Sequence, residues 1–482
     1  MDQVVLIGYF VSLSILFIFG LHGFIMIYYH RKYGYNNPVP KDKIDENAIV
    51  TIQLPLYNEM YVAERLIRTV CQIDYPKDKM EIQVLDDSTD ETTALVAKVV
   101  EEMKSQGFDI ANIRRGSREG FKAGALKEGM KIAKGEYIAI FDADFIPHKD
   151  FLKKTLAYFT DEKIGMVQTR WEHLNGDYSI ITKAQALALD GHFVIEQTVR
   201  NKSGFFINFN GTGGVWKKKC IEEAGNWHAD TLTEDLDLSY RAQLIGWRFV
   251  FLKDFTSPAE LPAEINALKN QQFRWTKGAV ETAKKILPLV WKSKIPLRVK
   301  LQSTFHLTNN LVFPFILLAA ILNVPLIFVK NSGAHEFYFA IMSLFVLAFI
   351  SSFLFYLYSQ KDIRTDWRKK IVLFPLFMAG SMGLAVNNSR AVFEGLMNRK
   401  SEFVRTPKFK QENEKDTWIG NKYLNRKLGF SVIVEAVLAV YCFIGVVSSI
   451  YFLELASIPF QLLFFLGFAF MAITSIKHAY AK

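Results

Sequence analysis

Long apolar runs near both ends of this 482-residue chain limit the folds that it can adopt. Each run is about 20 residues long or longer, the length that an α-helix needs to cross the hydrocarbon core of a bilayer. The five runs cover residues 4–29, 310–329, 337–358, 430–452 and 458–476. Residues from about 45 to 280 instead have the mixed composition of a globular domain. We therefore predict a multi-pass membrane protein that carries a globular domain between its spans.

Basic residues set the predicted topology, because loops rich in Lys and Arg stay in the cytoplasm. Such residues follow the first apolar run at 30–32 and the last at Lys477. Residues 371–386 are also apolar, but a span there would place the strongly basic segment 390–427 outside. We therefore predict an interfacial or re-entrant helix at 371–397, with the globular domain and the C-terminus in the cytoplasm.

The composition favours a membrane surface over nucleic acid as a partner. The chain has 58 Lys and Arg residues against 48 Asp and Glu residues, an excess that suits cytoplasmic flanks beside anionic lipid, and it has no nucleic-acid-binding motif. Cys71, Cys220 and Cys442 are too few and too far apart for a disulfide framework, so they fit a reducing compartment or a bilayer. No basic segment precedes the first run, which favours a retained anchor over a signal peptide.

Segments typical of strands and of helices alternate in the globular part, which indicates a mostly parallel α/β sheet. The clearest strand lies within residues 136–147 and is followed by Asp142 and Asp144, while Asp86 and Asp87 follow an earlier strand. Because ligands bind outside the carboxyl ends of such strands, we expect these acids to face one ligand.

Asp142 and Asp144 are two positions apart, so their side chains share a face of the extended chain. Two carboxylates side by side suit Mg²⁺ or Mn²⁺, whose coordination shells phosphate oxygens complete. A solvated acidic turn after the strand is the alternative.

Two helix starts carry further candidate residues. Gly120 and Gly124 flank Lys122, so that backbone N–H groups and an ammonium group could approach a phosphate, although no Walker motif is present. Thr233 is a predicted N-cap, and favourable interaction with the helix dipole would explain an acid in the turn after it. A catalytic role is the other explanation, in which Asp235 accepts a proton.

Two later segments suit a bulky ligand that carries phosphate. Residues 209–214 form a glycine-rich turn that such a ligand could approach closely. Arg274 and Trp275 place a guanidinium group beside an indole, a pair that could clamp a diphosphate and stack on a sugar ring. A basic helix lying on the membrane surface would also account for both residues.

Four motifs follow one another in a fixed order: Asp86-Asp87, Asp142-Ala143-Asp144, Thr233-Glu234-Asp235 and Gln271-Gln272-Phe273-Arg274-Trp275. In this order they resemble the processive family 2 glycosyltransferases, which include cellulose, hyaluronan and mannan synthases. The stretches 83–90, 122–129 and 141–145 look most like plant cellulose-synthase-like mannan synthases and xyloglucan-backbone glucan synthases. The resemblance covers residues 48 to 280 and extends to the membrane regions by layout.

The resemblance implies an α/β domain of the GT-A type (Rossmann-like) that binds a nucleotide sugar and is embedded between transmembrane α-helices. The expected divisions are a transmembrane anchor (1–32), the glycosyltransferase domain (33–275), an amphipathic interface helix (276–300), two transmembrane helices (301–360), an interfacial helix with a basic gating-type loop (361–427), and two transmembrane helices with a short cytoplasmic tail (428–482).

The resemblance also implies roles for individual residues. Those expected at the nucleotide sugar are Tyr57, Glu59, Asp86 or Asp87, Lys122, Gln271, Arg274, Thr406 and Lys408. Asp142 and Asp144 are expected to bind Mg²⁺ or Mn²⁺. Asp235, with Glu234 beside it, is expected to act as the general base. Those expected at the acceptor are Trp275, Phe209, Asn210 and Gly211, although the cysteine that is common in this acceptor-side motif is absent.

Thr406 and Lys408 belong to the stretch 403–408, which resembles the gating loop of cellulose synthases. Arg405 stands where that motif has Val. The family's loop closes over the nucleotide, and we expect the same here. A solvated basic linker is the alternative.

The expected function is an inverting, membrane-embedded transfer of hexose from UDP-glucose or GDP-mannose to a growing β-linked polysaccharide, with translocation of the product. The alternatives are transfer of one sugar to a lipid, as in ceramide glucosyltransferases, and a non-catalytic channel or scaffold subunit. The expected partners are the donor, a glycan acceptor and the bilayer of a bacterial inner membrane or a Golgi-type membrane, with accessory subunits left open.

Overall fold

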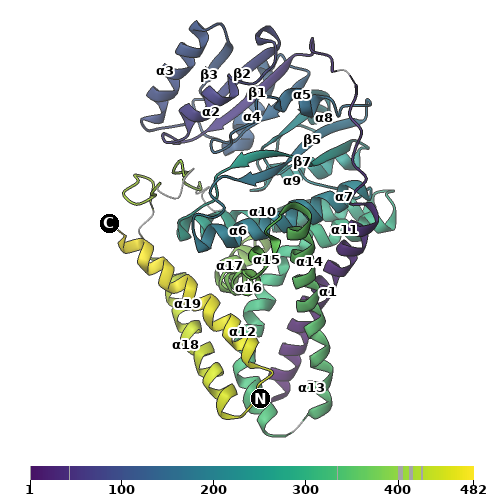
Figure 1. Ribbon diagram of the computed structural model, residues 1–482, viewed down its shortest axis with the longest axis vertical. Coiled ribbons are helices and arrows are strands. Elements are labelled where there is room, and N and C mark those ends of the chain that lie inside the picture. The colour runs from purple at the N-terminus through teal and green to yellow at the C-terminus, as the bar shows by residue number, and fades with distance from the viewer. Residues whose placement is uncertain are drawn as a thin grey trace.

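A globular α/β domain sits on a set of long helices in the computed structural model (Figure 1). The structure describes residues 2–42, 44–333, 335–399, 405–411, 416–424 and 427–481. Phe403 and Val404 of the gating-type stretch therefore lie outside the described residues, whereas the stretch 405–408 lies within them.

One seven-stranded sheet forms the centre of the globular domain. Its order is β3-β2-β1-β4-β6-β5-β7, and the strands are β1 (Val50–Leu56), β2 (Met80–Asp86), β3 (Asp109–Ile113), β4 (Tyr137–Ile140), β5 (Ile164–His173), β6 (Gly214–Lys217) and β7 (Arg248–Ala259). β6 runs antiparallel to β4 and β5, and the other pairs are parallel. The predicted mostly parallel sheet is confirmed.

Helices cover both faces of the sheet because successive strand residues point to opposite sides. In β4, Ala139 faces one apolar core, whereas Ile138 and Ile140 face another. The first core contains residues of α2 (Ala63–Val70), α3 (Thr92–Ser105) and α5 (Phe151–Leu156); the second contains residues of α4 (Phe121–Ile132), α8 (Lys218–Glu223) and α9 (Glu234–Leu244). The carboxyl ends of β1, β2 and β4 are left open between these layers.

Among the described residues, five helical segments are long and apolar enough to cross a membrane. They are α1 (Asp2–Tyr33), Leu297–Asn331, Glu336–Ile363, α18 (Phe430–Tyr451) and α19 (Ile458–Tyr480). They cover the five predicted runs, except that α18 ends one residue before the predicted end at 452. The second begins earlier than predicted because α11 (Leu297–Thr308) leads into α12 (Val312–Asn331). α14 (Val346–Ile363) ends the third.

The segment predicted to be interfacial or re-entrant is a bent pair of helices. The segment Trp367–Gly383, which ends in α16 (Phe374–Gly383), meets α17 (Ala385–Leu396) at a bend of 45°, as in a broken span or a re-entrant loop. Which side of the bilayer the globular domain faces stays a prediction.

A single helix, α10 (Ile265–Lys292), crosses the predicted division at 275/276. It lies between the sheet domain and the long helices (Figure 1). Gln271 and Arg274, expected at the donor, and the amphipathic segment expected at the membrane therefore belong to one continuous helix, and no separate interface helix begins at 276.

A buried ion pair joins α10 to the C-terminal helices. Lys269 Nζ lies 2.7 Å from Glu435 Oε2 on α18 and 2.8 Å from Ser475 Oγ on α19. Removing one charge leaves the other buried without compensation, which costs about 3–5 kcal/mol. We expect Lys269→Met to lower the melting temperature of the detergent-solubilised protein.

The matched control is the double variant Lys269→Met/Glu435→Leu, which removes both charges. Replacing a buried pair with apolar groups is often neutral, so the double variant should melt close to the wild type. If the single variant melts as the wild type does, the pair does not hold α10 against α18.

Candidate active site

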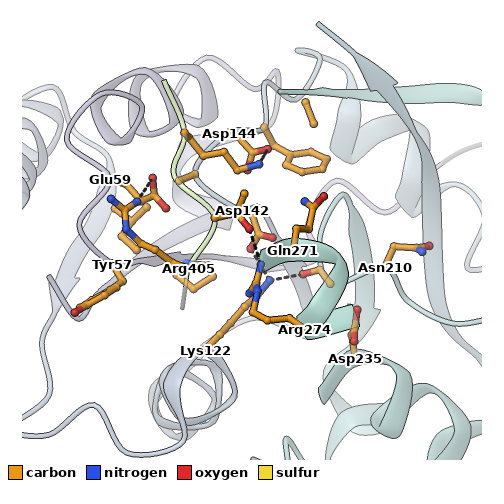
Figure 2. Close-up of a pocket in the computed structure, with 18 of the residues that line it drawn as sticks. Tyr57, Glu59, Lys122, Asp142, Asp144, Asn210, Asp235, Gln271, Arg274 and Arg405 are labelled. Atoms are coloured by element: carbon orange, nitrogen blue, oxygen red, sulfur yellow. Dashed lines mark hydrogen bonds and ion pairs between the residues drawn. The ribbon is translucent and has the colours of Figure 1, made fainter. Parts of the chain in front are cut away.

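A cavity of about 220 Å³ lies at the open edge of the sheet. Loops after β1, β2 and β4 line it together with α4, the start of α9, α10 and the segment 405–408 (Figure 2). All the predicted site residues are among those that the structure describes, and fifteen of them line the cavity: Tyr57, Glu59, Asp87, Lys122, Asp142, Asp144, Asn210, Gly211, Glu234, Asp235, Gln271, Arg274, Trp275, Thr406 and Lys408. The other two, Asp86 and Phe209, do not.

The doubled acid after β2 divides between two roles. Asp86 is fully buried, pairs with Arg114 at 2.6 Å and accepts a hydrogen bond from the backbone N–H of Ser88. Asp87 points the other way, lines the cavity and pairs with Arg115. The choice between them that the sequence left open therefore favours Asp87 as the residue that can reach a ligand.

Phe209 belongs to the core and not to the ligand site. Its side chain is fully buried, and its ring packs edge-on against Trp216 with the ring centroids 5.5 Å apart. The prediction that Phe209 contacts the acceptor is therefore not supported. The next two residues of the turn, Asn210 and Gly211, do line the cavity.

The two carboxylates after β4 each face an ammonium group. Lys122 Nζ lies 2.5 Å from Asp142 Oδ1, and Lys408 Nζ lies 2.6 Å from Asp144 Oδ2. Lys122 also donates to the backbone carbonyl of Gly211 at 2.9 Å. Two carboxylates on one short loop, both paired with cations, provide the oxygen donors that hard divalent ions prefer.

One other group among the described residues has the spacing of a cation site. The possible ligand atoms of His228, Asp230 and Asp237 lie within 4.8 Å of one another. Asp237 already pairs with Lys285 at 3.0 Å and with Arg241 at 2.8 Å. Because this group lies outside the cavity and its buried acid is neutralised, we assign no ion to it.

The predicted general base is the second residue of α9. Burial, and next the neighbouring Glu234 carboxylate, raise the pKa of Asp235 to about 7. Asp235 Oδ1 accepts a hydrogen bond from the backbone N–H of Leu236 at 2.8 Å. A carboxyl group with a pKa near neutrality, held at the wall of a cavity, is suited to accept a proton.

Thr233 is the N-cap of α9 by position but not by its side chain. Its hydroxyl makes a 3.0 Å hydrogen bond with Thr282 Oγ1 of α10 and none with the first turn of α9. This contact instead fixes α9 against α10, and so fixes the acid of one helix relative to the cations of the other.

Gly211 allows the turn to approach this acid. Its φ is +80°, and a Cβ atom there would lie 3.2 Å from Asp235 Oδ2 and 3.5 Å from Lys122 Nζ. Only glycine adopts this backbone conformation without strain. The missing side chain of Gly211 thus leaves room for Asp235 and Lys122, whereas the approach of a ligand to this turn stays a prediction.

α10 presents Gln271, Arg274 and Trp275 on one face, because residues three and four apart lie together on a helix. All three line the cavity. Arg274 Nη2 donates a hydrogen bond to Thr406 Oγ1 at 2.9 Å, so this helix holds the segment 405–408 over the cavity.

Two arginines that the sequence prediction did not assign to the site also line the cavity. Arg405 Nη1 lies 2.9 Å from Glu59 Oε2, and its guanidinium group lies 4.0 Å from the centre of the Tyr423 ring. Arg118 stacks on Tyr57 at 3.3 Å. Burial raises the pKa of Glu59 to about 7 against the opposing charge of Arg405. Arg405 directly precedes the predicted Thr406, and Arg118 lies four residues before the predicted Lys122.

Comparisons with known proteins agree with this geometry. A family model described as glycosyltransferase like family 2 matches residues 48–278. Glucomannan 4-beta-mannosyltransferase 1 of Oryza sativa subsp. japonica is 39% identical over 283 residues, which are 57% of this chain and 54% of that protein. Glucomannan 4-beta-mannosyltransferase 7 of Arabidopsis thaliana is 41% identical over 251 residues, which are 51% of this chain and 45% of that protein. The chain thus spans about half the length of these relatives.

A solved structure shares the fold. Mannosyltransferase PcManGT from Pyrobaculum calidifontis, in complex with GDP-Man and Mn²⁺, aligns with a TM-score of 0.56 and 18% identity, over 83% of this chain and 100% of that chain. At this identity the likeness concerns the fold alone, and it confirms the predicted α/β fold of the GT-A type.

Proposed function

We propose that this chain is a membrane-embedded inverting hexosyltransferase, because residues 48–278 match the model of glycosyltransferase family 2. It transfers sugar from a nucleotide donor to the growing end of a β-linked polysaccharide. The observation that carries this proposal is the placement of Asp235 in one cavity with Asp142 and Asp144 (Figure 2). A proton acceptor and the donor set for a divalent ion then face the same ligand.

The donor lies with its nucleoside near Tyr57, Glu59 and Asp87. Its diphosphate faces the cations that line the remainder of the cavity: Lys122, Arg274 and Lys408, with Thr406 beside them. GDP-mannose is the donor that we favour, since curated relatives are mannosyltransferases and the solved structure with this fold was obtained with GDP-Man. UDP-glucose is the alternative donor.

Asp142 and Asp144 are the residues that would hold Mg²⁺ or Mn²⁺. Their carboxylate oxygens are ligands that fit such an ion. In the structure each carboxylate lies within 2.6 Å of a lysine ammonium group. When bound, the ion neutralises negative charge on the leaving nucleoside diphosphate. Lys122 and Arg274 add positive charge at the same end of the cavity.

Transfer needs one base and no enzyme nucleophile. Asp235 takes the proton of an acceptor hydroxyl while the hydroxyl oxygen attacks the anomeric carbon. The bond from that carbon to the diphosphate breaks, and the diphosphate leaves with the electron pair. Attack opposite the leaving group inverts the anomeric centre. Because the pKa of Asp235 is about 7, the carboxylate is available at neutral pH and still basic enough to accept the proton.

The test is incorporation of radiolabelled sugar by the purified protein from GDP-mannose, and separately from UDP-glucose, with Mn²⁺ or Mg²⁺. Products are sized and digested with linkage-specific hydrolases. A long polymer that a β-mannanase or a β-glucanase degrades is the expected result. If the product is a single sugar on a lipid, the acceptor is a lipid and not a polysaccharide. If neither donor gives any transfer, the proposal is overturned in favour of a non-catalytic subunit.

A further inference from the structure

Behind the acceptor side of the cavity, a short π-helix holds the side chain of Asn210 from both ends. This helix, η2 (Gly191–Gln197), continues α6 (Ile180–Asp190). We propose that His192, Gln197 and Glu196 are positioning residues that fix the Asn210 amide as a hydrogen-bond donor to the nucleophilic hydroxyl of the acceptor. This inference rests on the proposed transferase function.

Asn210 lies beside the predicted base. It precedes Gly211, at which a Cβ atom would touch Asp235, and Figure 2 shows Asn210 and Asp235 on the same side of the cavity, away from Tyr57 and Glu59. A polar group at Asn210 is therefore placed to meet the hydroxyl that Asp235 deprotonates.

Hydrogen bonds fix which end of the amide is the oxygen. Gln197 Nε2 lies 2.7 Å from Asn210 Oδ1 and also donates to the backbone carbonyl of Asn208 at 2.8 Å. An amide nitrogen can only donate, so the Asn210 atom that faces Gln197 must be the oxygen. Asn210 Nδ2 then faces His192 Nε2 at 3.1 Å.

The same assignment of donors and acceptors determines the tautomer of His192. Since Asn210 Nδ2 donates, His192 Nε2 must accept, and the proton of a neutral imidazole then resides on Nδ1. His192 Nδ1 lies 3.0 Å from Glu196 Oε2, which accepts this proton in a hydrogen bond. Although burial opposes ionisation, Arg200 and next His192 hold the pKa of Glu196 well below its usual range.

The π-helical turn is what allows two residues of one helix to reach Asn210. Hydrogen bonds in a π-helix join residues five apart, so His192 and Gln197 lie one above the other. In an α-helix with 3.6 residues per turn, the same two residues would point about 140° apart. Isolated π turns are frequent at functional sites, and this one has a geometric reason.

One N–H of Asn210 remains available for a ligand. Within the part of the chain that the structure describes, the Asn210 amide donates to His192 alone and accepts from Gln197 alone. An acceptor hydroxyl has one hydrogen and two lone pairs. Its hydrogen points to Asp235, one lone pair accepts the second N–H of Asn210, and the other lone pair attacks the anomeric carbon. A flipped amide would offer oxygen and compete with Asp235 for the hydrogen.

The experiment compares His192→Phe, His192→Gln and Gln197→Glu with the wild type in sugar transfer and in nucleotide affinity measured by calorimetry. Phe keeps the ring volume but cannot accept a hydrogen bond, whereas Gln can present Oε1 to Asn210. Gln197→Glu keeps the shape but cannot donate. We expect His192→Phe and Gln197→Glu to lower kcat for transfer about 10–100-fold, as small misplacements do, with nucleotide affinity unchanged and His192→Gln within about fivefold of the wild type.

Each outcome decides the inference. It is overturned if His192→Phe transfers better than His192→Gln, since ring packing alone then matters, or if Gln197→Glu transfers as the wild type does. It is also overturned if nucleotide affinity falls as far as transfer, since the fold or the donor site is then disturbed. If His192→Phe does not fold, the isosteric Gln197→Glu decides. A wild type without transfer would refute the proposed function itself.

Discussion

Asp235→Asn is expected to abolish sugar transfer while leaving the donor bound. The substitution keeps the shape of the side chain and its hydrogen bond from the Leu236 N–H, but an amide cannot take up the acceptor's proton. General-base catalysis typically contributes about 10²–10⁴-fold, and we expect a loss of that size in kcat. Transfer of labelled sugar and nucleotide affinity by calorimetry, measured on the same preparations, check the prediction.

The pH dependence of the wild-type transfer rate should also report Asp235 as the base. Transfer requires the ionised form of Asp235, whose pKa is about 7, so the rate should rise with pH through neutrality and then level off. Glu234→Gln is the matched control. It removes the neighbouring carboxylate that raises this pKa, so the rise should move to lower pH with the maximal rate largely kept. Transfer by Asp235→Asn at a rate near that of the wild type would rule out Asp235 as the base.

Stability should respond in the opposite direction to pH. The pKa of Asp235 in the folded protein, about 7, lies above the value of about 3.9 in an unfolded chain. The folded state therefore holds an extra proton between these values, and its stability falls as pH rises through this window. Asp235→Asn removes that part of the decline, so its melting temperature should vary less between pH 4 and pH 7 than that of the wild type.

Several predicted residues line the cavity for a local reason. Asp142 and Asp144 follow an apolar strand, and parallel strands bring their carboxyl ends to one edge of the sheet. Gln271, Arg274 and Trp275 share a helix face because of their spacing. In both cases the position follows from the period of one element, and the sequence displays that period directly.

The residues that the sequence did not resolve depend on packing between distant segments. Asp86 and Asp87 occupy adjacent positions with opposite directions, and only the layering of the sheet decides that Arg114 takes the first. Phe209 directly precedes the cavity-lining residues Asn210 and Gly211, but its ring packs against Trp216 in the core. The Asn210 network depends on a π turn, for which the sequence carries no periodic signal.

The division expected at 275/276 falls inside one helix for a related reason. The change from site residues to amphipathic residues indicates two functions, and the structure places both on the continuous α10. Arg274 lies in the first half of this helix, and the amphipathic residues expected at the membrane follow it without a break. Lys269 and Glu435 join its first half to α18, so the part of the cavity wall that α10 forms is anchored to a C-terminal helix.

Asp142→Asn and Asp144→Asn are each expected to remove divalent-ion binding and, with it, most transfer. Loss of groups that only orient metal ligands typically costs 10–100-fold in affinity, so loss of a ligand itself should cost at least about 100-fold. Binding of Mn²⁺ in the presence of GDP, followed by electron paramagnetic resonance, reports this without reference to activity. A chelator should stop transfer by the wild type, and excess Mn²⁺ should restore it.

The structure supplies a matched control for the charge change. Asp177 pairs with Lys370 outside the cavity, so Asp177→Asn removes an aspartate from an Asp–Lys pair without touching the site. We expect it to bind Mn²⁺ as the wild type does. Lys408→Met tests the pair from the other side: with the ammonium gone from Asp144, Mn²⁺ alone should bind more tightly, whereas transfer should fall because the diphosphate loses a cation. If Asp142→Asn and Asp144→Asn both bind Mn²⁺ as the wild type does, the ion does not bind at this loop.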